Sequence, residues 1–325
     1  MKLLNYIVYA VVRAFLALTR FIPMRFTFWW VRGLSRLAYR LAKGRRALTL
    51  YNLELALGRE TPPEERERIG RLSFENMFLS IGELLHYNEI HMRNLDQHFT
   101  FAGTDILERY LAQKQGVFLI GGHLGGWTTM SLIFRFPQMP AVYLVAKGLG
   151  NPRLQGLLDY IAAPFNVHII SGKGLGRLIE ERVAQGNICQ FWMDQEARRD
   201  QGTFVQFFGQ DAATFAVPGY LAWKNQIPLV PYWIIRRKPG YFHVILREPL
   251  LYQLTDDKDE NNRRVAQAIA SEVERAIREH PEQWLWAHNR WRRRPDGTRV
   301  ELFTKKKKRS RGQGPAPAGE SDTGR

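Results

Sequence analysis

The sequence contains a single cysteine, Cys189, in 325 residues. One thiol cannot form an internal disulfide, so cysteine usage gives no indication of an oxidising compartment. No cysteines and histidines have the spacing of a zinc site, and we expect neither a metal nor a cofactor. No Gly-x-Ser-x-Gly motif is present, which weakens the case for a serine hydrolase.

Acidic residues are missing from one end of the chain and scarce near the other. Residues 1–46 contain ten Lys or Arg and no Asp or Glu, and residues 292–311 contain ten against two. Residues 47–291 are close to neutral, with 26 basic and 27 acidic residues. A nucleic-acid-binding domain more often carries its charge on the folded face, so we expect no nucleic-acid partner. Basic ends beside apolar sequence favour an anionic membrane surface, where each Lys or Arg contributes about 1 kcal/mol.

No long uninterrupted apolar run is present either. Residues 3–19 are mostly apolar, but they are fewer than the roughly 20 that span a bilayer, and Arg13 interrupts them. No small-residue cleavage site follows, so we expect no removed signal peptide. Residues 20–32 then mix aromatic side chains with arginines, which is typical of an in-plane amphipathic helix; ordinary core helices with solvated arginines are the alternative.

From residue 98 onward, short apolar segments alternate with amphipathic ones. The alternation predicts an α/β fold in which helices flank a mixed sheet. A helix is also expected from a Thr61 cap to about Tyr87, with Ile81 among its inward-facing residues. The polar segment 194–214 is expected to be a functional or disordered loop. The expected strands are 98–102, 117–121, 141–145, 167–170, 187–192, 229–235 and 241–247, and the expected helices include 104–114, 127–135, 152–162, 174–185 and 259–280.

These patterns divide the chain into three parts. Residues 1–46 form a basic, apolar segment that we expect to anchor the protein to a membrane. Residues 47–295 form the α/β domain and are numerous enough to bury a sizeable core. Residues 296–325 are basic and then rich in Gly, Pro and Ser, and we expect most of this tail to be disordered.

One histidine follows a predicted strand and is bracketed by glycines, a setting that suits a catalytic residue. His123 lies in Gly121–Thr128, directly after a short apolar run, with two glycines on each side. Glycine lets a ligand approach the backbone closely, and histidine is the side chain best matched to proton transfer near neutral pH. For a histidine taken alone, a packed loop residue is the alternative.

Three stretches occur in the order found in a known family. Together with the apolar N-terminus, they make residues 1–295 resemble the bacterial lipid A biosynthesis acyltransferases, which add lauroyl or myristoyl chains and belong to the lysophospholipid acyltransferase-like (glycerolipid acyltransferase) superfamily. The stretches are Gly122–Trp127; Asp194-Gln195 followed by Gly202–Gly209 and Ala212–Thr214; and Pro281–Trp286 followed by Arg290-Trp291 and Arg294-Pro295.

The resemblance implies a fold, a location and a reaction. The fold is a glycerolipid-acyltransferase-like mixed sheet with N-terminal membrane-associating helices, on the cytoplasmic face of the cell inner membrane. The reaction moves a fatty acyl chain from a thioester, on acyl carrier protein or coenzyme A, to a hydroxyl of a lipid A precursor or related lipid, with His123 as general base. The positions implied to bind substrate are Gly125, Gly126, Lys147, Asn151, Gln195, Gly202, Phe204, Phe207 and Phe208.

Some of these positions have a suggested role. Backbone N–H groups around Gly125 and Gly126 would stabilise the oxyanion. Phe204 and Phe208 would line an acyl groove or lie in the sheet core. Lys147, with Arg198 and Arg199, would meet phosphate or the acidic carrier protein, or be solvated surface charge.

One position departs from the family pattern. The family has His, four residues, then Asp or Glu, whereas the fifth residue after His123 is Thr128. A threonine hydroxyl can accept a hydrogen bond from the ring but cannot stabilise an imidazolium as a carboxylate does. Asp194 and Glu196 are candidate substitute acids. Three readings stay open: an active acyltransferase that uses another acid or none, a non-catalytic relative that binds lipid or carrier protein, and an enzyme with a glycerophospholipid or amino-lipid acceptor.

Overall fold

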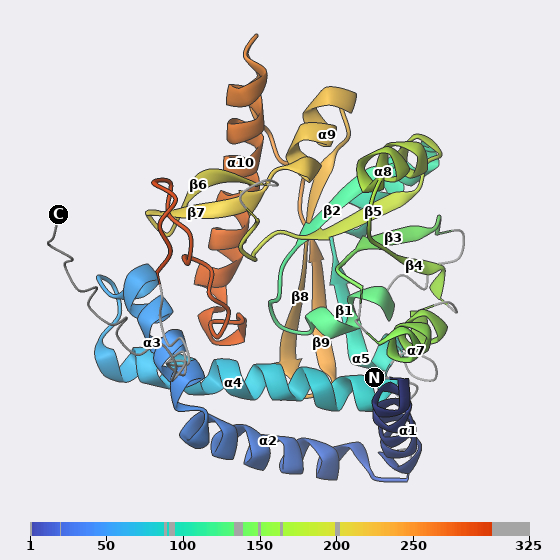
Figure 1. Ribbon diagram of the computed structural model, residues 1–325. Helices are drawn as coiled ribbons and strands as arrows, with labels where there is room; N and C mark the ends of the chain where they lie inside the picture. Colours follow the sequence, from blue (N-terminus) through green and yellow to red (C-terminus); the bar gives the residue numbers. More distant parts are fainter. Residues whose placement is uncertain are drawn as a thin grey trace, which may run out of the picture.

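The computed structural model describes residues 2–19, 21–87, 90, 95–132, 139–148, 151–162, 165–198 and 202–300. Its centre is a seven-stranded mixed sheet in the order β1-β9-β8-β2-β5-β3-β4 (Figure 1). β8 and β9 are antiparallel, and all other neighbouring strands are parallel. The strands are β1 (Phe99–Ala102), β2 (Val117–Gly121), β3 (Val142–Val145), β4 (Val167–Ile170), β5 (Ile188–Trp192), β8 (Leu229–Lys238) and β9 (Tyr241–Leu246). The α/β fold with a mixed sheet is therefore confirmed.

β2 is the central strand, and every residue in it is buried. Its side chains alternate between two hydrophobic cores, because successive residues of a strand point to opposite faces. Phe118 and Ile120 belong to the core that contains α10 (Lys258–Glu279). Leu119 belongs to the core on the other face, which contains residues of α6. A strand covered on both faces reads as a continuous apolar run, which is why the sequence identified it.

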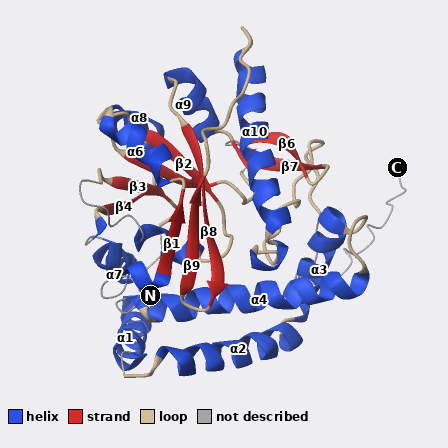
Figure 2. Cartoon of the chain, turned by 180° about the vertical axis from the view of Figure 1, so that it is seen from behind, coloured by secondary structure: helices blue, strands red, loops and turns tan. Residues whose placement is uncertain are grey.

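Helices cover both faces and one end of the sheet (Figures 1 and 2). α4 runs across the end of the sheet where β8 finishes, and α2 packs along α4. The helices besides α10 are α1 (Lys2–Thr19), α2 (Met24–Leu41), α3 (Lys43–Leu57), α4 (Pro63–Leu85), α5 (Leu95–His98), α6 (Thr104–Ala112), α7 (Pro152–Ala162), α8 (Leu175–Ala184) and α9 (Val217–Asn225). Among the residues that the structure describes, no helix is long and apolar enough to cross a membrane.

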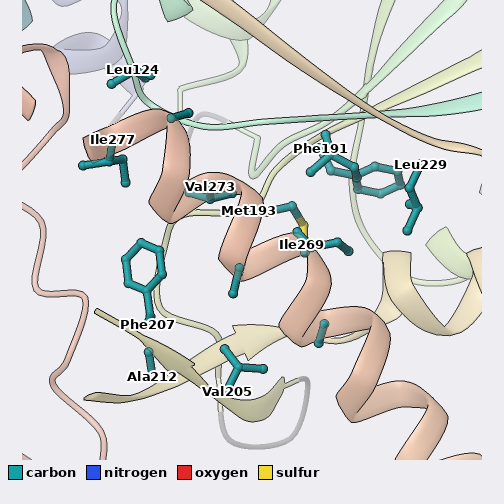
Figure 3. Packing of buried hydrophobic residues seen from close by; sticks show 14 of the residues in the cluster. Leu124, Phe191, Met193, Val205, Phe207, Ala212, Leu229, Ile269, Val273 and Ile277 are labelled. Atoms are coloured by element: carbon teal, nitrogen blue, oxygen red, sulfur yellow. The ribbon is translucent and has the colours of Figure 1, made fainter. Parts of the chain in front are cut away.

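The predicted loop at 194–214 was wrong in its second half. β6 (Gly202–Phe207) and β7 (Gln210–Phe215) form an antiparallel hairpin there, separate from the main sheet. Val205 and Phe207 of the hairpin point toward α10 (Figure 3). In β6 the exposed Gln206 stands between the buried Val205 and Phe207, so one face of the hairpin is buried and the other is exposed.

Three smaller expectations also need correction. The N-cap of α4 is Pro62, with no capping side chain, so Thr61 does not cap that helix. Ile81 is 51% exposed, because this part of α4 turns Ser80 and Glu83 inward instead. Residues Trp127–Leu132 form a 3₁₀ helix, not the start of an α-helix to 135, and the remainder of that predicted helix lies outside the described residues.

The three predicted parts can be located on the fold. The boundary at residue 46 falls inside α3, and α2 buries Phe28, Val31 and Tyr39. The tail is described only as far as residue 300, so the expected disorder beyond it lies outside the described residues.

Candidate functional site

The register of two central strands brings a histidine and an aspartate together. Gly121 of β2 pairs with Trp192 of β5 in a parallel arrangement. His123 and Asp194 each lie two residues beyond these partners, at the same edge of the sheet. The ring Nδ1 of His123 is 2.8 Å from Oδ1 of Asp194. The substitute acid that the sequence suggested therefore contacts His123.

Asp194 is a buried carboxylate whose hydrogen-bond capacity is well used. Its Oδ2 accepts from the backbone N–H of His123 and from the indole N–H of Trp284, both at 2.8 Å. Burial alone would raise the pKa of Asp194, but the contacts with His123 and Trp284 hold that pKa well below its usual range. The carboxylate is therefore ionised at neutral pH.

An ionised Asp194 fixes the state of the His123 ring. A carboxylate can only accept, so Nδ1 carries the proton that it donates to Oδ1. In the neutral ring, this tautomer leaves Nε2 with the lone pair that a general base requires. The ring packs against two indoles, with centroid distances of 4.6 Å to Trp127 and 5.1 Å to Trp192, and the indoles also contact each other at 5.5 Å. This contact holds the ring in one orientation and leaves His123 only 7% exposed.

Gln195 approaches the free side of that ring. Its Nε2 is 3.1 Å from Nε2 of His123, so the amide donates to the lone pair of the base. Gln195 directly follows Asp194 and thus shares the placement that the end of β5 provides. Both residues of the Asp-Gln pair noted in the sequence contact the same imidazole.

Gly122 permits the close approach of Asp194. A Cβ atom at Gly122 would be 3.0 Å from Cγ of Asp194, closer than such contacts normally come. Any side chain at this position would therefore push the carboxylate away from His123.

The backbone N–H groups of Gly125 and Gly126 have other partners. Gly125 N–H donates to the carbonyl of Gln283, and Gly126 N–H donates to the carbonyl of Ile234. Neither group is free to meet a developing oxyanion, so this role, guessed from their position in the sequence, is not supported. Gly125 has a φ of +60°, which glycine adopts without strain. These glycines anchor the turn after His123.

A buried ion pair contacts the same turn. Nε and Nη2 of Arg236 in β8 donate to the two carboxylate oxygens of Glu83 in α4, at 2.6 and 2.5 Å. The same guanidinium donates to the carbonyl of Gly125 at 3.2 Å and to the hydroxyl of Ser80 at 2.9 Å. It also contacts the amide oxygen of Asn76. The buried polar residues of α4 therefore bind Arg236, and Arg236 in turn binds the turn that follows His123.

Thr128 takes no part in the histidine contact. Its hydroxyl donates to the carbonyl of Ser80 at 3.2 Å, so it does not accept from the ring as the sequence had suggested. Glu196, the other candidate acid, uses its backbone N–H to reach Nε2 of His288 at 3.2 Å, and its carboxylate is 3.8 Å from Arg293. The acid at His123 is Asp194.

Several predicted substrate positions lie elsewhere. Asn151 donates to the backbone carbonyl of Asn5 at 3.0 Å and so joins α7 to α1. Lys147 is exposed at the end of β3. Phe207 and Phe208 are buried among Trp284, Trp286 and Trp291, which is the sheet-core alternative.

Gly202 and Phe204 are half-buried on β6, and Arg198 is exposed before it. Arg199 lies outside the described residues. Arg198, Gly202 and Phe204 line a separate hollow together with arginines from the C-terminal turn.

Three tryptophans of the site were not predicted as functional residues. Trp127 and Trp192 flank the ring, and Trp284 binds Asp194. Trp284 had been noted only as part of an aromatic C-terminal motif.

Comparison with known proteins identifies the family of the chain. The family model for bacterial lipid A biosynthesis acyltransferases matches residues 1–293. A lipid A biosynthesis lauroyltransferase of Escherichia coli (strain K12) is 27% identical over 270 residues, covering 82% of this chain and 85% of the relative. A lipid A biosynthesis acyltransferase 2 of Shigella flexneri is 23% identical, covering 79% and 78%. A lipid A biosynthesis palmitoleoyltransferase of E. coli is also 23% identical, covering 78% and 81%. The chain belongs to the bacterial lipid A biosynthesis acyltransferase family, and it is an enzyme of the acyltransferase type.

Proposed function

We propose that this acyltransferase moves a fatty acyl chain from an acyl carrier protein thioester to a hydroxyl of a lipid A precursor, with His123 as general base. The observation that carries the proposal is the contact between Nδ1 of His123 and Oδ1 of Asp194 at 2.8 Å. The acceptor class follows the relatives, which are a lauroyltransferase, a palmitoleoyltransferase and an acyltransferase of lipid A biosynthesis.

The chemistry proceeds in two proton transfers. Nε2 of His123 takes the proton of the acceptor hydroxyl as its oxygen attacks the thioester carbon. Asp194 stabilises the imidazolium that results. Collapse of the tetrahedral intermediate breaks the carbon–sulfur bond, and the imidazolium returns its proton to the departing thiolate. The products are an ester and a free carrier thiol, so the step needs no cofactor.

Gln195 is the side chain best positioned to help the oxyanion. In the free enzyme its amide donates to Nε2 of His123. An acceptor hydroxyl takes over Nε2 when it binds, and the amide is then released beside the reacting carbon. An N–H donor at this place stabilises the charge that develops on the thioester oxygen.

The site favours catalysis over the binding-only alternative. A protein that only binds lipid has no need for an ionised carboxylate buried against an imidazole, since burying such a group is costly. The Asp194 carboxylate restores the acid that is missing at Thr128. It supports an active enzyme whose acid comes from the next strand.

The decisive test measures turnover of purified protein in detergent, with acyl carrier protein thioester and a lipid A precursor. His123→Ala should lower kcat by about 10²- to 10⁴-fold, the usual contribution of a general base. His168→Ala, an exposed histidine on β4, is the matched control and should keep wild-type turnover. Equal turnover by the His123 variant would overturn the assignment. Parallel assays with a glycerophospholipid acceptor and a coenzyme A donor decide the substrates.

A membrane-facing role is proposed for the outer side of α2. Trp29 and Trp30 are 67% and 61% exposed, Leu41 is 70% exposed, and the nearby Arg36 and Arg40 are also exposed. Indoles and arginines on one helix face suit an anionic lipid interface. The proposal places the protein on the cytoplasmic face of the inner membrane.

That placement can be tested by flotation with vesicles that contain an anionic lipid. Trp29→Gln combined with Trp30→Gln should reduce the bound fraction, and Leu251→Gln should not, although Leu251 is 94% exposed. Binding that is unchanged in the double variant would contradict the role of α2.

A further inference from the structure

Four arginines surround a small hollow that the reaction described above does not use. The hollow has a volume of about 80 Å³ and lies between the β6–β7 hairpin and the turn around Gly297. Its arginines are Arg198, Arg293, Arg294 and Arg299, and Phe204 contributes to its wall. A liquid water occupies about 30 Å³, so a compact anion fits and an acyl chain does not.

The turn that presents these arginines is well defined. Asp296 accepts from the backbone N–H and the hydroxyl of Thr298, at 2.8 and 2.6 Å. Gly297 has a φ of +85°, and Arg293 and Arg299 pair as an antiparallel bridge. The two arms of this short turn therefore hold Arg293 opposite Arg299, and the N–H of Arg294 donates to the carbonyl of Thr298, without needing a ligand.

Little negative charge offsets these arginines. Arg293 donates to the carbonyl of Ala197, and its Nε is buried with no hydrogen-bond partner. Two carboxylates lie near the hollow, Glu196 at 3.8 Å from Arg293 and Asp296 in the turn beside Arg294, so the four arginines keep a net positive charge. Arg294 and Arg299 are exposed and form no ion pair with a carboxylate in the described part of the chain. Guanidinium groups in this state bind phosphate oxygens through paired N–H donors.

The hollow is also close to the reacting groups. Ala197, which Arg293 contacts, is three residues after Asp194. Three residues of extended chain span about 10 Å at most. A group bound in the hollow and a group at His123 can therefore belong to one substrate molecule.

We propose that this hollow binds a phosphate group of a substrate of the acyl transfer. The proposal rests on the proposed function for the word substrate, but the anion site itself does not depend on it. The phosphate is either a phosphate ester on the acceptor lipid or the phosphodiester that joins the donor thiol to its carrier. Both present the same tetrahedral anion to the arginines.

The first experiment measures binding alone. Inorganic phosphate is titrated with full-length protein in a phosphate-free detergent, and the ³¹P resonance width is followed. The double variant Arg294→Ala/Arg299→Ala should weaken phosphate binding about tenfold or more, the loss expected for charge-assisted hydrogen bonds. Arg177→Ala, an exposed arginine on α8, should leave it unchanged. Equal weakening by both, or by neither, would overturn the anion site.

The second experiment identifies the source of the phosphate. KM is measured for the acceptor with and without its phosphate, and for the acyl carrier protein donor against an acyl N-acetylcysteamine thioester, which has no phosphodiester. The Arg294→Ala/Arg299→Ala variant is compared with the wild type. If its KM rises tenfold only for the phosphorylated acceptor, the hollow binds the acceptor. If its KM rises only for the carrier-bound donor, the hollow binds the donor. A rise that persists for substrates without phosphate contradicts the proposal. Wild-type protein that binds phosphate but shows no turnover would overturn the proposed function and leave the anion site standing.

Discussion

Trp284 donates its indole N–H to Oδ2 of Asp194 at 2.8 Å, across 90 residues of sequence. The residue before it, Gln283, accepts from the backbone of Gly125, and Trp284 itself bridges to Leu124. The three sequence motifs therefore meet at one point. The C-terminal motif occupies the second carboxylate oxygen, which leaves the first for His123.

Asp194→Asn should abolish most of the activity while the fold survives. The amide oxygen can still accept from Trp284 and from the His123 backbone, so the amide nitrogen faces Nδ1. That arrangement places the ring proton on Nε2 and removes the base. We expect kcat to fall by up to about 10⁴-fold with little change in KM, as when a triad carboxylate is neutralised. Asp159→Asn on exposed α7 is the control, and a kcat above a tenth of wild type would contradict the prediction.

Thr128→Glu should give no gain in turnover. The Thr128 hydroxyl donates to the carbonyl of Ser80, and a carboxylate there would meet an acceptor instead of a donor. The substitution should also fail to rescue Asp194→Asn. Recovery of kcat in that double variant would show that the family position of the acid still reaches His123.

Gln195→Ala separates two roles for the amide. As an oxyanion donor, its loss should lower kcat by about 10²- to 10³-fold, the usual cost of removing one such donor. If the amide only covers Nε2 of His123, its loss should raise kcat/KM by freeing the base. Gln195→Glu keeps the shape, removes the donor and adds a negative charge beside the oxyanion, so it should lower kcat at least as much as the alanine variant does.

Much of the fold could be predicted because its strands are buried on both faces. β2 reads as a continuous apolar run and β5 as an apolar run interrupted by Gln190, and their ends marked His123 and Asp194. The register that joins those ends, Gly121 with Trp192, cannot be read from either strand alone. The sequence could therefore offer Asp194 as a substitute acid but not choose it over Glu196.

Two of the errors arise because tertiary contacts, which the sequence does not show, decide which face of an element is buried. Ile81 was predicted to face inward in place of Ser80 and Glu83. Arg236, the partner that allows Glu83 and Ser80 to be buried, lies 153 and 156 residues away from them in the sequence. The hairpin at β6 and β7 looked like a loop because its outer face is polar. In both cases a distant partner decided which side of the element faces the core.

Arg236→Met should destabilise the protein strongly. Glu83 is completely buried, and the loss of its partner leaves an uncompensated charge that costs about 3–5 kcal/mol of unfolding free energy. Adding Glu83→Met should recover much of that stability, because it removes the charge. Turnover should stay low in the double variant, since the Gly125 carbonyl has lost its Arg236 donor. Wild-type kcat in a stable double variant would show that the network does not position the turn after His123.

His288 should make stability depend on pH. Burial lowers the pKa of His288 to about 4, below the value of about 6.5 expected in the unfolded chain. Between these values the unfolded chain binds a proton that the folded chain does not, so stability is full above pH 6.5 and is lost as the pH falls toward 4. The loss approaches about 3 kcal/mol. His288→Gln keeps an acceptor for the Glu196 N–H but does not titrate, so urea unfolding at pH 7.5 and 4.5 should show that much less pH dependence. His168→Gln should lose as much unfolding free energy between pH 7.5 and 4.5 as the wild type does. An equal loss in the His288 and His168 variants would refute the assignment.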